Sequence, residues 1–176
     1  MSCIGKGNHL GKLGEISDWC SEFNVRFKLN SVINKYNHTE DFRENILRLK
    51  AFRWKCFQVL EVETENKGVD AKRDAKEFLI SDEEFGEFCS RHEDLDCFVP
   101  ESNFLMKSSY IILDEYLRFL SKGDKYGESK SILDVENVEE LLATTDYDQT
   151  TFEDRGGIYP WTKQSSCGEI DPKYQW

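Results

Sequence analysis

The sequence predicts an α/β fold built around a parallel sheet, and three observations predict it. Two segments that alternate apolar and polar residues, 25–30 and 52–60, flank a helical pattern over 40–49. Strand, helix and strand within about 35 residues is the size of a parallel βαβ unit. A further helical pattern and a further short apolar run follow, so the order stays mostly β, α, β, α.

Length and composition limit the classes of protein. The chain has 176 residues, 39% of them apolar and 13% aromatic, which indicates a single domain with a packed core. A net charge of −11 argues against a general nucleic-acid-binding surface. No run approaches the roughly 18 apolar residues of a membrane helix, and "MSCIGKGNHLGKL" lacks the apolar stretch of a signal peptide. We therefore expect a cytosolic chain with reduced thiols.

The first elements follow from residue spacing. A helix is expected over 8–23, where apolar residues recur at spacings of three and four. The strand over 25–30 comes next, because its apolar residues alternate with polar ones. Asn37 or Thr39 is the expected N-cap of the helix over 40–49, which leads into the second strand.

The middle of the chain contains clear start and stop signals. Apolar residues over 69–79 suggest a helix. Ser81 and Glu84 have the spacing of a capping box, which predicts that another helix begins there. A short strand over 95–99 is expected to stop at Pro100.

The last third of the chain is less regular. The run 108–120 fits a helix or a strand, and its tyrosine and isoleucines favour the strand. A strand over 131–135 is expected to lead into a helix over 136–143, and the last thirty residues to be irregular. Ligands in folds of this order bind at the carboxyl ends of the strands.

Cysteine and histidine spacing does not predict a metal site. None of the six cysteines forms CxxC or CxxxC, and the three histidines lie in polar settings. Cys56 and Cys97 are interpreted as small apolar core residues.

Two expected strands carry polar side chains two residues apart, and such side chains share a face. Lys28 and Asn30 share one face of the first strand, and Arg53 and Lys55 share one face of the second. Cations inside a fold need a counter-charge. One interpretation is therefore a solvated edge or an internal set of ion pairs. The acidic candidates are Glu61, Glu63 and Asp114. The other interpretation is a bound polyanion, which lysine and arginine recognise well.

A third segment favours the polyanion. In "FEDRGGIYPW", Arg155 precedes two glycines, and a Gly-Gly backbone can approach a phosphate closely. Arg155 brings the number of positive charges to four. A nucleoside triphosphate carries about four negative charges near neutral pH.

Long segments of the chain resemble a known family. They are "FKLNSVINKYN", "FRWKCFQVLEVETEN" with the later "DEEF" and "VPESN", and "SYIILDEYLRFL" with the later "SKSILDV" and "FEDRGGIYPW". From about Ile4 to Trp161 the chain resembles the C-terminal half or more of the viperin family of interferon-induced antiviral radical-SAM enzymes. The resemblance implies a partial (β/α) barrel of the radical-SAM type, C-terminal part only. Residues 1–143 would belong to the barrel, and 144–176 would form a tail whose RGG loop covers phosphates.

The resemblance also implies an activity. In the family, a [4Fe-4S] cluster cleaves S-adenosylmethionine to a 5′-deoxyadenosyl radical, which removes the 4′ hydrogen of CTP. Loss of water then gives 3′-deoxy-3′,4′-didehydro-CTP, a chain terminator for viral polymerases, so the enzyme is a lyase of innate immunity. By resemblance, the nucleotide-binding residues are Lys28, Asn30, Arg53, Lys55, Arg155 and Gly156. Tyr110 matches a tyrosine near the sugar that would supply a hydrogen atom or a proton.

The sequence departs from the family pattern at three places. It contains no CxxxCxxC, so we expect a fragment, an incomplete gene model or a truncated paralogue that is inactive alone. Lys6 stands where the family has an arginine that helps bind S-adenosylmethionine. Trp176 keeps only the last residue of the signal that the cytosolic iron–sulfur delivery machinery reads.

Two expectations about the whole protein follow from the resemblance. The family attaches to the endoplasmic reticulum and lipid droplets through an N-terminal amphipathic helix, which these 176 residues lack. The alternative to an enzyme fragment is a truncated, non-catalytic protein that binds nucleotides or another partner.

Overall fold

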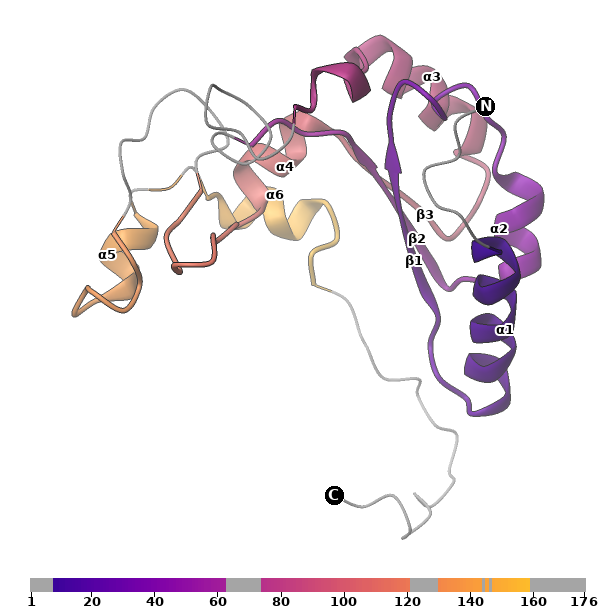
Figure 1. Ribbon diagram of the computed structural model, residues 1–176, viewed down its shortest axis with the longest axis horizontal. Helices are drawn as coiled ribbons and strands as arrows, with labels where there is room; N and C mark the ends of the chain where they lie inside the picture. The colour runs from indigo at the N-terminus through magenta and orange to yellow at the C-terminus, as the bar shows by residue number, and fades with distance from the viewer. Residues whose placement is uncertain (1–7, 63–73, 121–129, 144, 146, 159–176) are drawn as a thin grey trace, which may run out of the picture.

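The computed structural model describes residues 8–62, 74–120, 130–143, 145 and 147–158, and it shows a mixed α/β arrangement. Three strands form a parallel sheet in the order β1-β2-β3 (Figure 1). The strands are β1 (Lys28–Ile33), β2 (Arg53–Gln58) and β3 (Phe98–Glu101). The prediction of an α/β chain with parallel strands is therefore confirmed.

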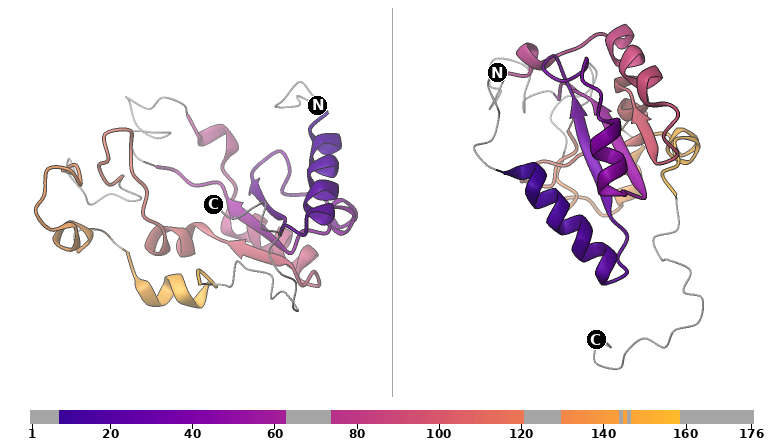
Figure 2. Two further views of the ribbon diagram at one scale, coloured as in Figure 1. Left: turned by 90° about the horizontal axis from the view of Figure 1, so that it is seen from below. Right: turned by 90° about the vertical axis from the view of Figure 1, so that its right-hand side faces the viewer.

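The helices lie in two groups on opposite sides of the sheet (Figure 1). The first group is α1 (His9–Glu22), α2 (Arg43–Leu49) and α3 (Asp82–His92). The second group is α4 (Asn103–Ser109), α5 (Val138–Leu142) and α6 (Gln149–Asp154), and Figure 2 shows α5 farthest from the sheet. None of the helices in the described ranges is long and apolar enough to cross a membrane.

The apolar core lies between the sheet and the first group of helices. Trp54 of β2 is fully buried, and its ring meets the ring of Phe88 of α3 edge to face at 6.1 Å. Its indole N–H donates to Ser31 Oγ at 3.0 Å, so the one polar atom of the ring is satisfied. His92 joins α2 to α3, because its Nε2 accepts the backbone N–H of Phe42 at 3.0 Å.

The signals at helix starts were confirmed for α3 and wrong for α2. Ser81 and Glu84 form the expected capping box. Helix α2 begins after Phe42, with no side-chain hydrogen bond at its N-cap. Asn37 instead accepts the backbone N–H of Asn34 at 2.8 Å and donates to Val32 O, so its amide stabilises the preceding turn.

Strand β3 runs through Pro100 instead of stopping there. The backbone N–H of Trp54 donates to Cys97 O at 2.7 Å. Backbone groups alternate sides along a parallel strand, so Cys97 and Val99 face β2 while Pro100 faces away from it. A proline is tolerated at that position because its missing N–H would point out of the sheet.

Four expectations for the rest of the chain were wrong or only partly right. The run 108–120 contains no strand and begins inside α4, a helix that the sequence did not predict. Residues 131–135 form a turn rather than a strand, although α5 follows as expected. In the last thirty residues, α6 forms where irregular chain was expected. Within the described part of 69–79 there is only a short 3-10 helix, η1 (Lys76–Phe78).

Candidate functional site

The register of β1 and β2 places the basic residues side by side. Lys28 pairs with Arg53, and Asn30 pairs with Lys55, so all four side chains leave the same face of the sheet. We call these four residues the cation face. It is opposite the face that carries Trp54 and the core. Asn30 is exposed, Lys28 and Arg53 are half-buried, and Lys55 is buried.

Lys55 is buried against an acid that the sequence analysis did not name. Its residue is 5% exposed, and its ammonium pairs with Glu101 of β3, which is 0% exposed. Burial lowers the pKa of Lys55 and Glu101 opposes that effect, while Arg155 and Lys28 add to it. The internal ion-pair interpretation is thus correct for Lys55, with Glu101 as its partner.

One acid considered from the sequence, Asp114, has a different cationic partner. Asp114 pairs with Arg118 at 2.8 Å, and hydrogen bonds from Arg118 help lower the pKa of Asp114 against the effect of burial. Glu63 lies outside the described residues. The signal for Glu101 was its position two residues after Val99, which places both on one face of β3 once the strand continues past Pro100.

Arg155 reaches the same acid from the residue that follows α6. Its Nη1 lies 3.0 Å from Glu101 Oε1, and its Nη2 donates to Ser109 O at 3.1 Å. The guanidinium also lies over the ring of Tyr110, 4.2 Å from the centroid, and the Arg155 side chain is only 3% exposed. These contacts hold the RGG segment against Glu101 and Tyr110.

A second contact fixes the glycine after Arg155. Arg53 Nη2 donates to Gly156 O at 2.8 Å. Gly156 has a φ of +73°, and a Cβ there would lie 3.3 Å from Arg53 Nη2. Both the backbone conformation and the space beside the guanidinium therefore favour glycine.

Tyr110 completes the cluster. It follows α4 directly, and its hydroxyl oxygen accepts hydrogen bonds from Lys55 Nζ at 3.2 Å and from Arg155 Nη1 at 3.4 Å. Burial raises the pKa of Tyr110, and Glu101 raises it further, while Arg155 lowers it. The phenol is therefore neutral near neutral pH and can act as a hydrogen donor.

All six predicted nucleotide-binding residues and Tyr110 thus lie in one region. Glu101 compensates one of the four cations, so the free site carries less positive charge than the sequence suggested. The expected residues Lys6 and Trp176 lie outside the described part of the chain.

The cysteines that the structure describes do not fit an iron–sulfur cluster. Cys56 is buried in the core and Cys97 packs against it, as expected from the sequence. Burial raises the pKa of Cys56, and it raises the pKa of Cys89 to about 11. Within the described ranges, no group of three or more histidine, cysteine or acidic side chains could hold a metal ion.

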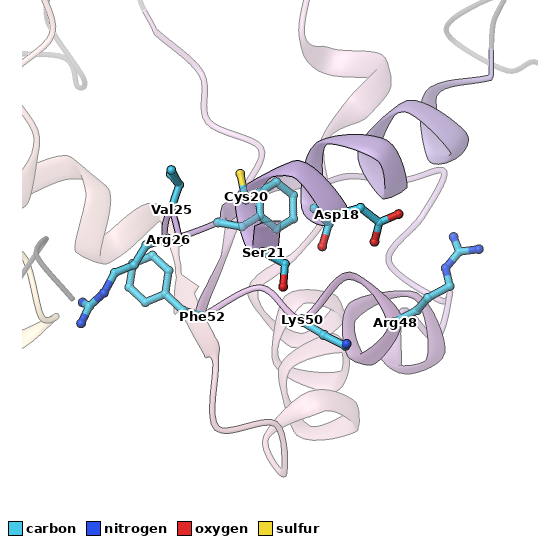
Figure 3. Close-up of a pocket in the computed structure, with 10 residues that line it drawn as sticks. Asp18, Cys20, Ser21, Val25, Arg26, Arg48, Lys50 and Phe52 are labelled. Carbon is cyan, nitrogen blue, oxygen red and sulfur yellow. The ribbon is translucent and has the colours of Figure 1, made fainter. Parts of the chain in front are cut away.

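A separate cavity of about 400 Å³ lies between α1 and the segments that precede β1 and β2. Its lining includes Asp18, Arg26, Arg48 and Lys50. Figure 3 shows Arg26 and Arg48 pointing to opposite sides, so these two cations do not converge on one anion. None of the predicted site residues lines it.

Comparison with known proteins gives related sequences. No protein-family model matches the chain. It is similar to two proteins named S-adenosylmethionine-dependent nucleotide dehydratase RSAD2. The Oncorhynchus mykiss protein is 49% identical over 160 residues, which are 90% of this chain and 46% of that protein. The Danio rerio protein is 46% identical over 173 residues, which are 98% of this chain and 46% of that protein.

A bacterial protein is also similar. The S-adenosylmethionine-dependent nucleotide dehydratase of Lacinutrix mariniflava is 37% identical over 148 residues, 84% of this chain and 30% of that protein. The chain spans about half the length of the two RSAD2 proteins that it matches.

Proposed function

The chain belongs to the RSAD2, or viperin, family, and on that premise we propose that it forms the nucleotide-binding part of an S-adenosylmethionine-dependent nucleotide dehydratase. The observation that carries the proposal is the cation face. Two strands in register present lysine, arginine and asparagine side chains toward one region, and the RGG segment docks beside them.

The substrate is a nucleoside triphosphate, CTP by the family resemblance. Lys28 and Arg53 are the partly exposed cations, so they bind the phosphates first. Asn30 is exposed beside them and adds a neutral donor. Lys55, Arg155 and Gly156 form the inner wall of the site. Tyr110 supplies a hydrogen atom or a proton at the sugar, and the product is 3′-deoxy-3′,4′-didehydro-CTP.

The whole protein supplies the rest of the reaction. The [4Fe-4S] cluster and S-adenosylmethionine provide the radical when bound, and the cysteines of the described part do not hold that cluster. The three strands belong to the partial (β/α) barrel of the radical-SAM type. The protein works in antiviral defence, on the cytosolic face of the endoplasmic reticulum and lipid droplets.

The alternative function is nucleotide binding without catalysis. It needs only the cation face, which strands β1 and β2 of the described part form. The two functions share the same binding site and differ only in the chemistry that follows. An encoded upstream segment with CxxxCxxC, joined to this chain, would give SAM-dependent conversion of CTP only if the enzyme function holds.

Calorimetric titration of the chain with CTP tests the binding site. Loss of one charge-assisted hydrogen bond costs about 1.5–3 kcal/mol, so Lys28→Ala and Arg53→Ala should each weaken binding by roughly tenfold to a hundredfold. Lys12→Ala is the matched control, because Lys12 lies on α1 in a surface pair with Glu15. Absence of CTP binding, or equal binding by all four proteins, would rule out the site. Titrations with UTP and with tripolyphosphate then show how much the base contributes.

A further inference from the structure

Glu101 is a buried acid with an unusual set of neighbours. It is 0% exposed, and its Oε1 meets both the Lys55 ammonium and the Arg155 guanidinium. Its Oε2 is also buried and has no hydrogen-bond partner among the described residues. A buried carboxylate is costly unless its partners compensate it fully. Packing alone therefore does not explain an acid at this position.

The hydroxyl of Tyr110 lies among the same groups. Lys55 Nζ at 3.2 Å and Arg155 Nη1 at 3.4 Å both donate to the phenol oxygen. Two cations beside a phenol favour its ionised form. Glu101 has the opposite effect, because it neutralises the cations and its negative charge disfavours the ionised phenol.

We propose that Glu101 is a positioning residue for Tyr110: its carboxylate holds Lys55 and Arg155 beside the phenol and keeps the hydroxyl protonated and oriented as a hydrogen donor. The proposal rests on the proposed function only for the role of Tyr110 in the reaction. The arrangement itself needs no ligand. The Arg155 guanidinium stacks over the Tyr110 ring and binds Ser109 O, so it also fixes the ring where α4 ends.

The charged groups around Tyr110 come from each element packed against it. Strand β2 contributes Lys55, β3 contributes Glu101, and the segment after α6 contributes Arg155. Lys28 of β1 lowers the pKa of Lys55. Phe57 of β2 covers one side of the Tyr110 ring, with centroids 6.2 Å apart. Among the charged groups, Glu101 has the largest effect on the pKa of Tyr110.

Alkaline absorbance at 295 nm tests the proposal without a ligand or cofactor. The chain has seven tyrosines, so each protein is compared with its own Tyr110→Phe version and the difference reports Tyr110 alone. Between pH 10 and 12 this difference should show less tyrosinate in the natural chain than an exposed tyrosine gives. In Glu101→Gln, which keeps the shape and removes the charge, the tyrosinate-to-phenol ratio should rise by about tenfold or more. Glu101→Asp keeps the charge and should stay close to the natural chain.

Unchanged ionisation of Tyr110 in a folded Glu101→Gln protein would overturn the proposal. Circular dichroism at each pH shows whether the protein is folded, since an unfolded one would titrate all its tyrosines together. Should Glu101→Gln fail to fold, Lys55→Met/Glu101→Gln removes one charge of each sign and carries the same test. Arg155 then acts alone, and Tyr110 must still ionise at lower pH than in the natural chain.

The outcome for the proposed function is separate. CTP titration of the natural chain reports on the cation face, whereas the tyrosinate signal reports on Glu101. Loss of CTP binding with the expected tyrosinate change would overturn the nucleotide function and keep the positioning role of Glu101. CTP binding without the expected tyrosinate change would keep the nucleotide function and overturn the positioning role of Glu101.

Discussion

Removal of Glu101 should cost more stability than removal of one of its partners. In Glu101→Met, Lys55 and Arg155 stay buried without a counter-ion. In Lys55→Met, Glu101 keeps Arg155 at 3.0 Å. Breaking a buried pair costs about 3–5 kcal/mol. We expect a loss of about 5 kcal/mol in the free energy of unfolding for Glu101→Met, and of about 3 kcal/mol or less for Lys55→Met.

The double variant sharpens this prediction. Lys55→Met/Glu101→Met leaves only Arg155 uncompensated, so it should be more stable than Glu101→Met by about 1–2 kcal/mol, and the effects of the two substitutions should be clearly non-additive. Urea unfolding followed by circular dichroism measures the free energy of unfolding of the natural chain, the two single variants and the double variant. Lys12→Met is the control, because an exposed pair contributes at most about 1 kcal/mol. The reasoning would be refuted by additive effects, or by a Glu101→Met protein as stable as Lys55→Met.

Three further predictions concern the core and the tyrosine. Trp54→Ala should lower the free energy of unfolding by about 3–5 kcal/mol, whereas Trp19→Ala, at a 55% exposed position, should cost far less in the same urea assay. Burial raises the pKa of Cys56, so iodoacetamide at pH 8 should label half-buried Cys20 long before Cys56; mass spectrometry that finds equal labelling would contradict this. The pKa of Tyr110 is raised in the folded state, so the protonated phenol stabilises the folded chain. This contribution to the free energy of unfolding is complete below about pH 10 and is lost as pH rises further. The Tyr110→Phe protein should lack this loss of stability at alkaline pH. If the free energy of unfolding falls equally steeply between pH 9 and 11 in the natural chain and in Tyr110→Phe, the prediction is wrong.

The parts of the fold that depend on local pattern could be predicted from the sequence. The apolar spacing predicted α1, the alternation predicted β2, and the capping box predicted the start of α3. The alternation also predicted β1, but over 25–30, three residues before its observed range of 28–33. The errors lie where distant contacts decide. Pro100 is compatible with a strand only because its backbone faces out of the sheet, and that direction depends on the pairing with β2. Helix α4 did have a local signal, since Ser102 caps it by accepting the N–H of Leu105.

The candidate site shows the same division. The period of two along each strand predicted that Lys28 shares a face with Asn30 and that Arg53 shares a face with Lys55. The register of β1 with β2, which only the structure shows, brings both pairs to one face of the sheet. Glu101 was missed because the expected strand ended two residues too early. The contact between Arg155 and Glu101 joins residues 54 positions apart, and no local pattern contains that information.

The proline in β3 also makes the two margins of the sheet unequal. A fourth strand laid beside β3 would find a donor missing at Pro100, whereas β1 contains no proline and carries an N–H at every residue. Lateral growth of the sheet is therefore favoured next to β1. Such growth would move Lys28 and Asn30 from the rim of the sheet to its interior, where a phosphate would meet them with less competition from water.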